Sequence, residues 1–236
     1  MSISRIFGSR TSADDEHWIS VSDLMAGLMV IFLFIAITYI RDIRIERDQI
    51  RQIAVAFDET KSRLYEALEE EFRDDLPRWN AELDRQTLSL RFQEPEILFD
   101  SQSTNLKDKF RLILADFFPR YLRVLRSFED SIEEVRVEGH TSSEWQGARD
   151  GDDAYFRNMD LSQGRTRAVL EYCLLLPAVL DSKQWAIRYL TANGLSSSKP
   201  IIGEGEEDRE RSRRVEFRVR TNAETQIVRI LGTNRP

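Results

Sequence analysis

From Leu24 to Ile40 the chain has no charged side chain, although 32% of its residues overall are charged. Counting the preceding turn from Trp18, this segment is close to the roughly 20 residues that a helix needs to cross a bilayer. Residues 18–40 are therefore predicted to form a transmembrane helix. The remainder of the 236 residues suffices for a connector and one globular domain of ordinary size.

A cleaved signal peptide is the alternative for this segment. The sequence after Ile40 has no small-residue cleavage site and continues directly into charged residues, so an uncleaved anchor is favoured. The local excess of arginines after the span would place the C-terminal side in the cytoplasm. The arginines that flank the span are Arg5, Arg10, Arg41, Arg44, Arg47 and Arg51.

Asp23 lies inside this predicted span. An ionisable residue within a membrane helix costs about 2.5 to 3.5 kcal/mol on insertion scales and is typical of an ion pathway or a partner contact. Alternatively, Asp23 sits solvated at the headgroup level or caps the helix start. The small or flexible residues that follow it suit close helix packing: Met25, Ala26, Gly27 and Met29. One helix cannot enclose a pore, so an ion relay at Asp23 requires a partner membrane protein.

After the span, apolar residues recur at every seventh position among many charges: Ile43, Ile50, Phe57 and Leu64. This spacing predicts a helix with a narrow apolar seam. A parallel homodimer is favoured over a helix that lies against its own domain, although Glu46 and Thr60 occupy poor seam positions. Pro77 is expected to end the helical region.

Two compositional features exclude other classes of function. The net charge of -7 and the pI near 5.1, without a sustained basic block, argue against nucleic acid as a partner. The single cysteine, Cys173, has no internal partner and lies in an apolar run, so it is interpreted as a buried core thiol rather than a reactive one.

The C-terminal part alternates strand and helix patterns. Three half-buried strands are predicted around Leu88–Phe92, Val135–Val137 and Val215–Val219. Helices are predicted at about 106–126, 161–176 and 185–193, the last one ending at Gly194. This order indicates an α/β sandwich with helices on one face of a small sheet.

Three spaced motifs in this region carry a resemblance. They are residues 137–142 (VEGHTS), 158–169 (NMDLSQGRTRAV) and 212–216 (SRRVE), together with Gly194. Residues 86–222 resemble the OmpA-like peptidoglycan-binding domain in these motifs. The resemblance implies a pocket for the diaminopimelate group of the peptide stem, built here from Thr141, Ser142, Asn158, Leu161 and Arg165.

In this family an acid after the Gly-x-Thr motif takes the ligand's ammonium, and Arg165 matches the arginine that takes the carboxylate. A guanidinium fork suits a carboxylate bidentately. Ser142 occupies the acidic position, and an insertion at 144–156 lengthens the next loop. Either an acid of this loop supplies the missing negative charge, or the affinity for peptidoglycan is weaker or differently selective. The candidate acids are Glu144, Asp150, Asp152 and Asp153. For Arg165 the alternative is an ion pair on the helix surface.

Catalysis is not expected. His140 is one of only two histidines, and the sequence has neither metal-ligand spacing nor a nucleophile motif. The chain is therefore interpreted as a non-enzyme that has neither a cofactor nor a resident metal.

The membrane pattern from Trp18 to Asp23 (WISVSD), the helical connector and the OmpA-like domain together resemble the B subunits of ion-driven stators, such as that of the flagellar motor, and in particular the B subunit of the Zorya anti-phage defence system. This resemblance implies a homodimer surrounded by a pentameric ring of a polytopic A subunit. Asp23 would relay the ion, a proton in preference to sodium. A flagellar-type or accessory stator subunit and a passive membrane-to-wall anchor remain alternatives.

The predicted layout is a cytoplasmic tail (1–17), the transmembrane helix (18–40), a helical dimerising connector (41–85), the OmpA-like domain (86–222) and a C-terminal tail (223–236). A wall-binding domain must face the periplasm, so the resemblance places the N-terminus in the cytoplasm and the protein in the bacterial inner membrane. This orientation is the opposite of the one that the excess of arginines after the span indicates, and we prefer it.

Overall fold

A computed structural model describes the backbone of residues 12–93, 98–100 and 102–222. The side chains at 12–20, 49, 52–54 and 56–58 fall outside this description, as do most of the predicted N-terminal tail and all of the predicted C-terminal tail. The chain divides into two compact units, Met1–Ala54 and Val55–Pro236, each considered by itself.

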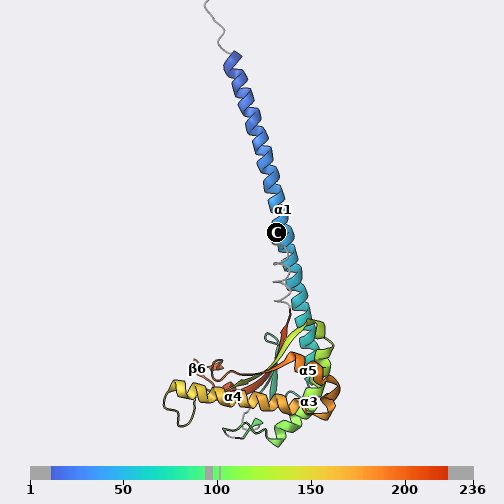
Figure 1. The fold of residues 1–236 in the computed structure, drawn as a ribbon, viewed down its shortest axis with the longest axis vertical. Coiled ribbons are helices and arrows are strands. Elements are labelled where there is room, and N and C mark those ends of the chain that lie inside the picture. The colour runs from blue at the N-terminus through green and yellow to red at the C-terminus, as the bar shows by residue number, and fades with distance from the viewer. Residues whose placement is uncertain (1–11, 94–97, 101, 223–236) are drawn as a thin grey trace, which may run out of the picture. The chain divides into compact units, whose positions relative to one another are not determined.

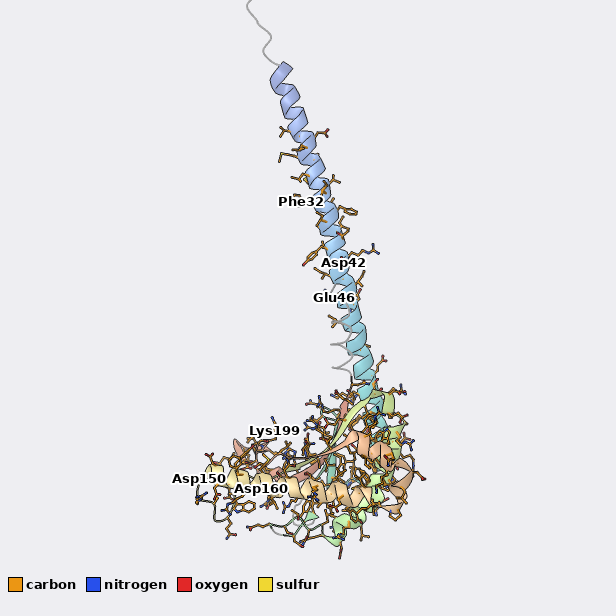
Figure 2. All side chains as sticks on the ribbon, viewed as in Figure 1. Phe32, Asp42, Glu46, Asp150, Asp160 and Lys199 are labelled. Atoms are coloured by element: carbon orange, nitrogen blue, oxygen red, sulfur yellow. The ribbon has the colours of Figure 1, made fainter. Side chains whose placement is uncertain are left out.

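The first unit is formed by helix α1, which extends from Ser12 to Phe72 and continues into the second unit. Its sequence contains no proline and only one glycine, Gly27, so nothing interrupts the backbone hydrogen bonds. The segment Val21–Asp48 is long and apolar enough to cross a membrane, and its side chains are exposed, as Phe32 illustrates (Figure 2). The apolar helix agrees with the predicted transmembrane segment.

The apolar seam of α1 divides into two parts. Ile43 and Ile50 are exposed in the first unit, whereas Leu64 and Leu68 are fully buried in the core of the second. For its last turns the alternative interpretation is therefore correct, since the helix packs against its own domain. The side chain of Phe57 lies outside the described residues.

The second unit contains a five-stranded sheet in the order β1-β2-β7-β3-β4. Only β3 and β4 pair in parallel, and the other neighbours are antiparallel. The strands are β1 (Ala81–Asp84), β2 (Ser89–Phe92), β3 (Ile132–His140), β4 (Leu190–Gly194) and β7 (Arg214–Thr221). The three predicted strands correspond to β2, β3 and β7, while β1 lies before residue 86, where the domain was expected to begin.

Three main helices accompany the sheet: α3 (Asp108–Arg126), α4 (Gly151–Leu174) and α5 (Lys183–Tyr189). Figure 1 shows α4 running along the sheet. Shorter elements are η1 (Glu129–Ser131), η2 (Pro177–Ser182), β5 (Ile202–Gly203), β6 (Glu206–Glu207) and α6 (Arg209–Ser212). The predicted mixed fold with one N-terminal apolar helix is thus confirmed.

Two predicted helix boundaries are wrong. The helix expected at 185–193 ends at Tyr189, because the chain then extends into β4 and pairs with β3. The helix expected from 161 begins at Gly151, where the Asp150 carboxylate accepts a hydrogen bond from the backbone N–H of Asp153 and caps the first turn. Part of the predicted inserted loop is therefore helical.

Aromatic rings dominate the core beneath the sheet. The Phe217 ring lies 5.0 Å from that of Phe117 and 5.8 Å from that of Tyr121, measured between centroids. Phe72 and Trp79 join the same cluster from the end of α1 and the turn after it. Cys173 is fully buried, and burial raises the pKa of its thiol, as suits a core residue.

Two glycines bring α4 directly onto the sheet. Gly139 of β3 and Gly194 of β4 are paired in register. A Cβ on Gly194 would lie 2.3 Å from the backbone nitrogen of Gln163, and one on Gly139 would lie 3.0 Å from the carbonyl oxygen of Ser162. Only glycine permits this approach, which fixes α4 at the end of β3.

Leu68→Ala tests whether the end of α1 belongs to this core. We expect the free energy of unfolding to fall by about 2 to 5 kcal/mol, because the substitution leaves a cavity. Urea unfolding of the detergent-solubilised full chain, followed by tryptophan fluorescence, measures it. Leu112→Ala, at a position 73% exposed, is the control. Unchanged stability combined with loss of a dimer would instead assign Leu68 to an intermolecular seam.

Candidate ligand-binding cavity

A cavity of about 400 Å³ opens beside the end of β3 and the first half of α4. This volume is within the roughly 300 to 1,000 Å³ range of small-molecule sites. All five residues singled out in the sequence line it: Thr141, Ser142, Asn158, Leu161 and Arg165. The rest of the lining is Phe99, Asp100, Gln102, Lys107, Glu144, Trp145, Gln146 and Arg213.

Asn158 shapes one wall of the cavity. Its side-chain Nδ2 donates to the carbonyl oxygens of Ser142 and Glu144, both at 3.1 Å, and so ties the loop after β3 to α4. The backbone N–H of Thr141 donates to the Ser196 carbonyl at 2.9 Å. The Thr141 hydroxyl is buried without a hydrogen-bond partner among the described residues. This oxygen is therefore an unsatisfied polar atom in the cavity wall.

Arg165 lines the same cavity from α4, two helical turns after Asn158. Its Nε donates to the Ser103 carbonyl at 2.9 Å, and its guanidinium carbon lies 4.7 Å from the centroid of the Phe99 ring. Burial, followed by the nearby charge of Arg213, lowers the pKa of Arg165 to about 10, so the group remains charged at neutral pH. Within the described part of the chain, no carboxylate pairs with Arg165, in contrast to the alternative of a surface ion pair.

Only one of the four candidate loop acids lines the cavity. Asp150 caps α4, where Figure 2 labels it, and Asp153 pairs with Arg157 at 2.9 Å. Glu144 lies at the cavity, where Oε1 meets Arg209 Nη1 at 2.6 Å. Asp152 does not line the cavity. Glu144 is therefore the one of these four acids that lines the cavity, and its carboxylate is paired there with Arg209.

Sequence reasoning did not single out seven of the lining residues: Phe99, Asp100, Gln102, Lys107, Trp145, Gln146 and Arg213. Phe99 and Asp100 precede α3 and are far in sequence from the motifs. Arg213 stands within the SRRVE motif without an assigned role, and its adjacent pair of arginines was the available signal.

Asp23 lies in the first unit, on the exposed surface of α1. It is the one charged residue between Val21 and Ile40. Its position within the apolar segment is as predicted, and its role as an ion relay remains a prediction.

Comparison with known proteins identifies the family. Zorya protein ZorB of Escherichia coli is 52% identical over 219 residues, which cover 92% of this chain and 93% of that protein. The chain belongs to the ZorB family. No protein-family model matches it.

Two solved structures are similar to the C-terminal unit of this ZorB-family chain. A putative MotB-like protein from Desulfovibrio vulgaris, 23% identical, matches with a TM-score of 0.50 over 70% of this chain and 97% of that one. The cell wall anchor of the type VI secretion system from Pseudomonas aeruginosa is 25% identical, with a TM-score of 0.46 over 65% and 96% of the two chains. The first likeness shows a common fold for the C-terminal unit.

A second polar cluster lies in the sheet beside the cavity. Glu138, His140 and Glu216 place potential ligand atoms within 4.8 Å of one another, all buried. Arginines nevertheless occupy the carboxylates, since Glu216 Oε1 accepts from Arg214 Nε at 2.6 Å and from Arg91 Nε at 2.9 Å. Guanidinium charges at these oxygens oppose a metal cation, so the residues fit an internal ion network better than a metal site.

Cross-strand register explains this network. Glu138 is directly opposite Glu216, and Arg136 is directly opposite Arg218, both unfavourable like-charge pairs. A diagonal contact compensates, in which Arg218 Nε lies 3.4 Å from Glu138 Oε2. Burial alone would raise the pKa of Glu216, but the hydrogen bond from Arg214 and the charge of Arg91 lower it to about 2.

Glu216→Gln should reduce the free energy of unfolding by about 3 kcal/mol at pH 7, because it leaves buried arginines without their counter-charge. The folded-state pKa of about 2 is below the ordinary 4.5, so this stabilisation is complete above pH 4.5 and is lost as the pH falls towards 2. Urea unfolding from pH 7 to pH 3 should show the variant and the parent converging.

The exposed ion pair between Glu82 and Arg91 offers the control for this experiment. Glu82 lies 3.6 Å from Arg91 and has a half-exposed side chain, so Glu82→Gln should change stability by less than about 1 kcal/mol at every pH. A constant difference between Glu216→Gln and the parent across this pH range would contradict the network.

Proposed function

We propose that this ZorB-family chain is the B subunit of a stator-like, ion-driven membrane motor in anti-phage defence, and that its C-terminal unit anchors the complex to peptidoglycan. The observation that carries the anchoring role is the single cavity that gathers Thr141, Ser142, Asn158, Leu161 and Arg165. The exposed apolar segment with one acid, Asp23, supports the motor role.

The cavity offers both charges that a zwitterionic diamino acid requires. Arg165 presents a guanidinium without a carboxylate partner among the described residues, and Glu144 presents a carboxylate at the rim. Charge-assisted hydrogen bonds of this kind are stronger than neutral ones. The diaminopimelate of the peptide stem is therefore the ligand that we assign to this site.

The exposed first part of the seam supports a homodimer. Ile43 and Ile50 are 46% and 38% exposed, and their seven-residue spacing suits a parallel pair of helices. Two membrane helices held together in this way would present two Asp23 carboxylates to the surrounding A subunits, in a pentameric ring. Because a peptidoglycan-binding unit must face the cell wall, we expect the C-terminal unit in the periplasm and the N-terminus in the cytoplasm.

In this arrangement Asp23 would accept and release the transported ion, for which we expect a proton rather than sodium. Movement of one charge through about 100 mV supplies roughly 2.3 kcal/mol. This energy is comparable to the cost of holding a charged carboxylate in the membrane, so ionisation of Asp23 can bias a conformational step.

Asp23→Asn should leave membrane insertion and peptidoglycan retention intact but abolish ion conduction and phage protection, because the amide cannot carry the ion. Proton flux into proteoliposomes that contain both subunits and plaque counts on expressing cells measure these effects. Ser22→Ala, at the neighbouring position, is the control. Full protection by Asp23→Asn or Asp23→Leu would favour a passive anchor, and a motility defect without an infection phenotype would favour a flagellar-type stator.

Arg165→Ala should reduce co-sedimentation of the detergent-solubilised full chain with purified peptidoglycan by about tenfold or more, because the lost hydrogen bonds are charge-assisted. Arg167→Ala, on the exposed side of α4, is the matched control. Equal retention of the Arg165 variant and the parent would show that Arg165 only ties α4 to the segment around Ser103.

A further inference from the structure

We propose that the C-terminal segment, residues 224–231, packs back onto its own C-terminal unit and covers a second cavity, which lies between α1 and the end of β7. The segment itself lies outside the described residues, whereas the surface beside its origin is described. This cavity shares no lining residue with the candidate ligand-binding cavity. The proposed contact is therefore independent of peptidoglycan binding.

The second cavity has a volume of about 140 Å³ and is lined by three elements. Lys61 comes from α1, Thr87 and Leu88 from the turn between β1 and β2, and Val219 and Thr221 from β7. Leu88 and Val219 are 3% and 4% exposed, so their side chains give the cavity an apolar base. The backbone N–H of Val219 donates to the Leu88 carbonyl at 3.1 Å, and Leu88 has a φ of 49°, which is unfavourable for leucine. The base is thus held in place by the sheet.

The C-terminal segment originates at this cavity. Thr221 lines it, and the next residue, Asn222, is held at a fixed place. The backbone N–H of Asn222 donates to the Ser131 carbonyl at 3.0 Å, and its Nδ2 donates to the Asp130 carbonyl at 2.7 Å. Ile227 follows five residues later, so even an extended chain keeps it within about 18 Å of Asn222. The segment can therefore reach the cavity while the described residues stay where they are.

The sequence of the segment suits an apolar base. Its four apolar residues have the i, i+1, i+3, i+4 spacing of one face of a helix: Ile227, Val228, Ile230 and Leu231. Arg229 is on the opposite face, and Gly232, a residue typical of helix ends, follows directly. A helix this short is unstable alone in water, so it needs a surface against which its apolar face is buried.

Charge complementarity favours the same occupant. Two cations line the cavity, Lys61 and Arg220. Arg220 already lies 3.7 Å from Glu133 and 3.4 Å from Glu134. Among the described residues no carboxylate forms an ion pair with Lys61. Glu224 is the only acid of the predicted C-terminal tail and precedes the apolar residues by one helical turn. Pairing of Glu224 with Lys61 would place Ile227 over the apolar base.

The docked segment would brace α1 against β7. Leu64 and Leu68 already bury one stripe of α1 in the core of this unit. Lys61 lies one turn before Leu64, so the segment would extend this attachment of α1 by one further turn.

Hydrogen exchange of the detergent-solubilised full chain tests the docking. Amides of residues 226–231 should exchange at least about tenfold more slowly than in a free peptide of the same sequence. The double variant Ile227→Asp/Leu231→Asp should lose this protection, because a carboxylate is costly to bury on an apolar base. Arg229→Asp, on the opposite face, is the matched control and should keep the protection.

Charge reversal tests the predicted ion pair. Lys61→Glu should reduce the protection of the segment by about two- to fivefold, and addition of Glu224→Lys in the same chain should restore it. Equal protection in Lys61→Glu and the parent would show that Lys61 and Glu224 do not meet.

Disulfide formation identifies the surface that the segment covers. In the full chain, Lys61→Cys combined with Ile227→Cys should oxidise at least about tenfold faster than Lys61→Cys combined with Arg229→Cys, and the product should be a monomer. The native Cys173 is fully buried, so it does not compete.

Three outcomes would overturn the proposal. The first is exchange of the parent segment at the free-peptide rate, and the second is unchanged protection in Ile227→Asp/Leu231→Asp. The third is a crosslinked product that consists only of covalent dimers, which would assign the cavity to the C-terminal segment of a second copy.

Discussion

The contact between α4 and the paired glycines Gly139 and Gly194 is the constraint on which the C-terminal unit depends. Because neither strand carries a Cβ there, the backbone of α4 lies directly on the β3–β4 pair. This contact fixes the position of α4, so Asn158 meets the loop that leaves β3 and Arg165 meets the segment around Ser103. Close helix–strand packing thus builds one side of the cavity, and the segment before α3 together with Arg213 completes it.

The two faces of the sheet differ in chemistry, since one is aromatic and the other is charged. One face packs Phe92, Phe217 and their neighbours against helices, and this aromatic core also includes Phe72 at the end of α1. The other face holds alternating arginines and glutamates, whose unfavourable like-charge pairs are compensated diagonally around Glu216. Arg214 belongs to this network, whereas the adjacent Arg213 lines the cavity.

Much of this organisation could be predicted from the sequence, wherever a residue pattern was compatible with only one local structure. Alternation identified β2, β3 and β7, and the motif residues Thr141 to Arg165 do share a cavity. Strand β4 was missed because its residues continue the pattern of α5, and pairing with β3 decides their conformation. The seam through Leu64 was ambiguous, because a narrow apolar stripe suits a partner helix and the helix's own domain equally well. Phe99 and Arg213 reach the cavity only through the tertiary fold.

The central claim is that this cavity holds peptidoglycan in the periplasm, and photocrosslinking in living cells tests it most directly. A photoreactive amino acid at Gln146, which lines the cavity and is exposed, should crosslink the chain to muropeptides released from the cell wall. The same amino acid at Ile187, an exposed position of α5 that does not line the cavity, should give no such product. Equal crosslinking at both positions, or none at Gln146, would contradict the account.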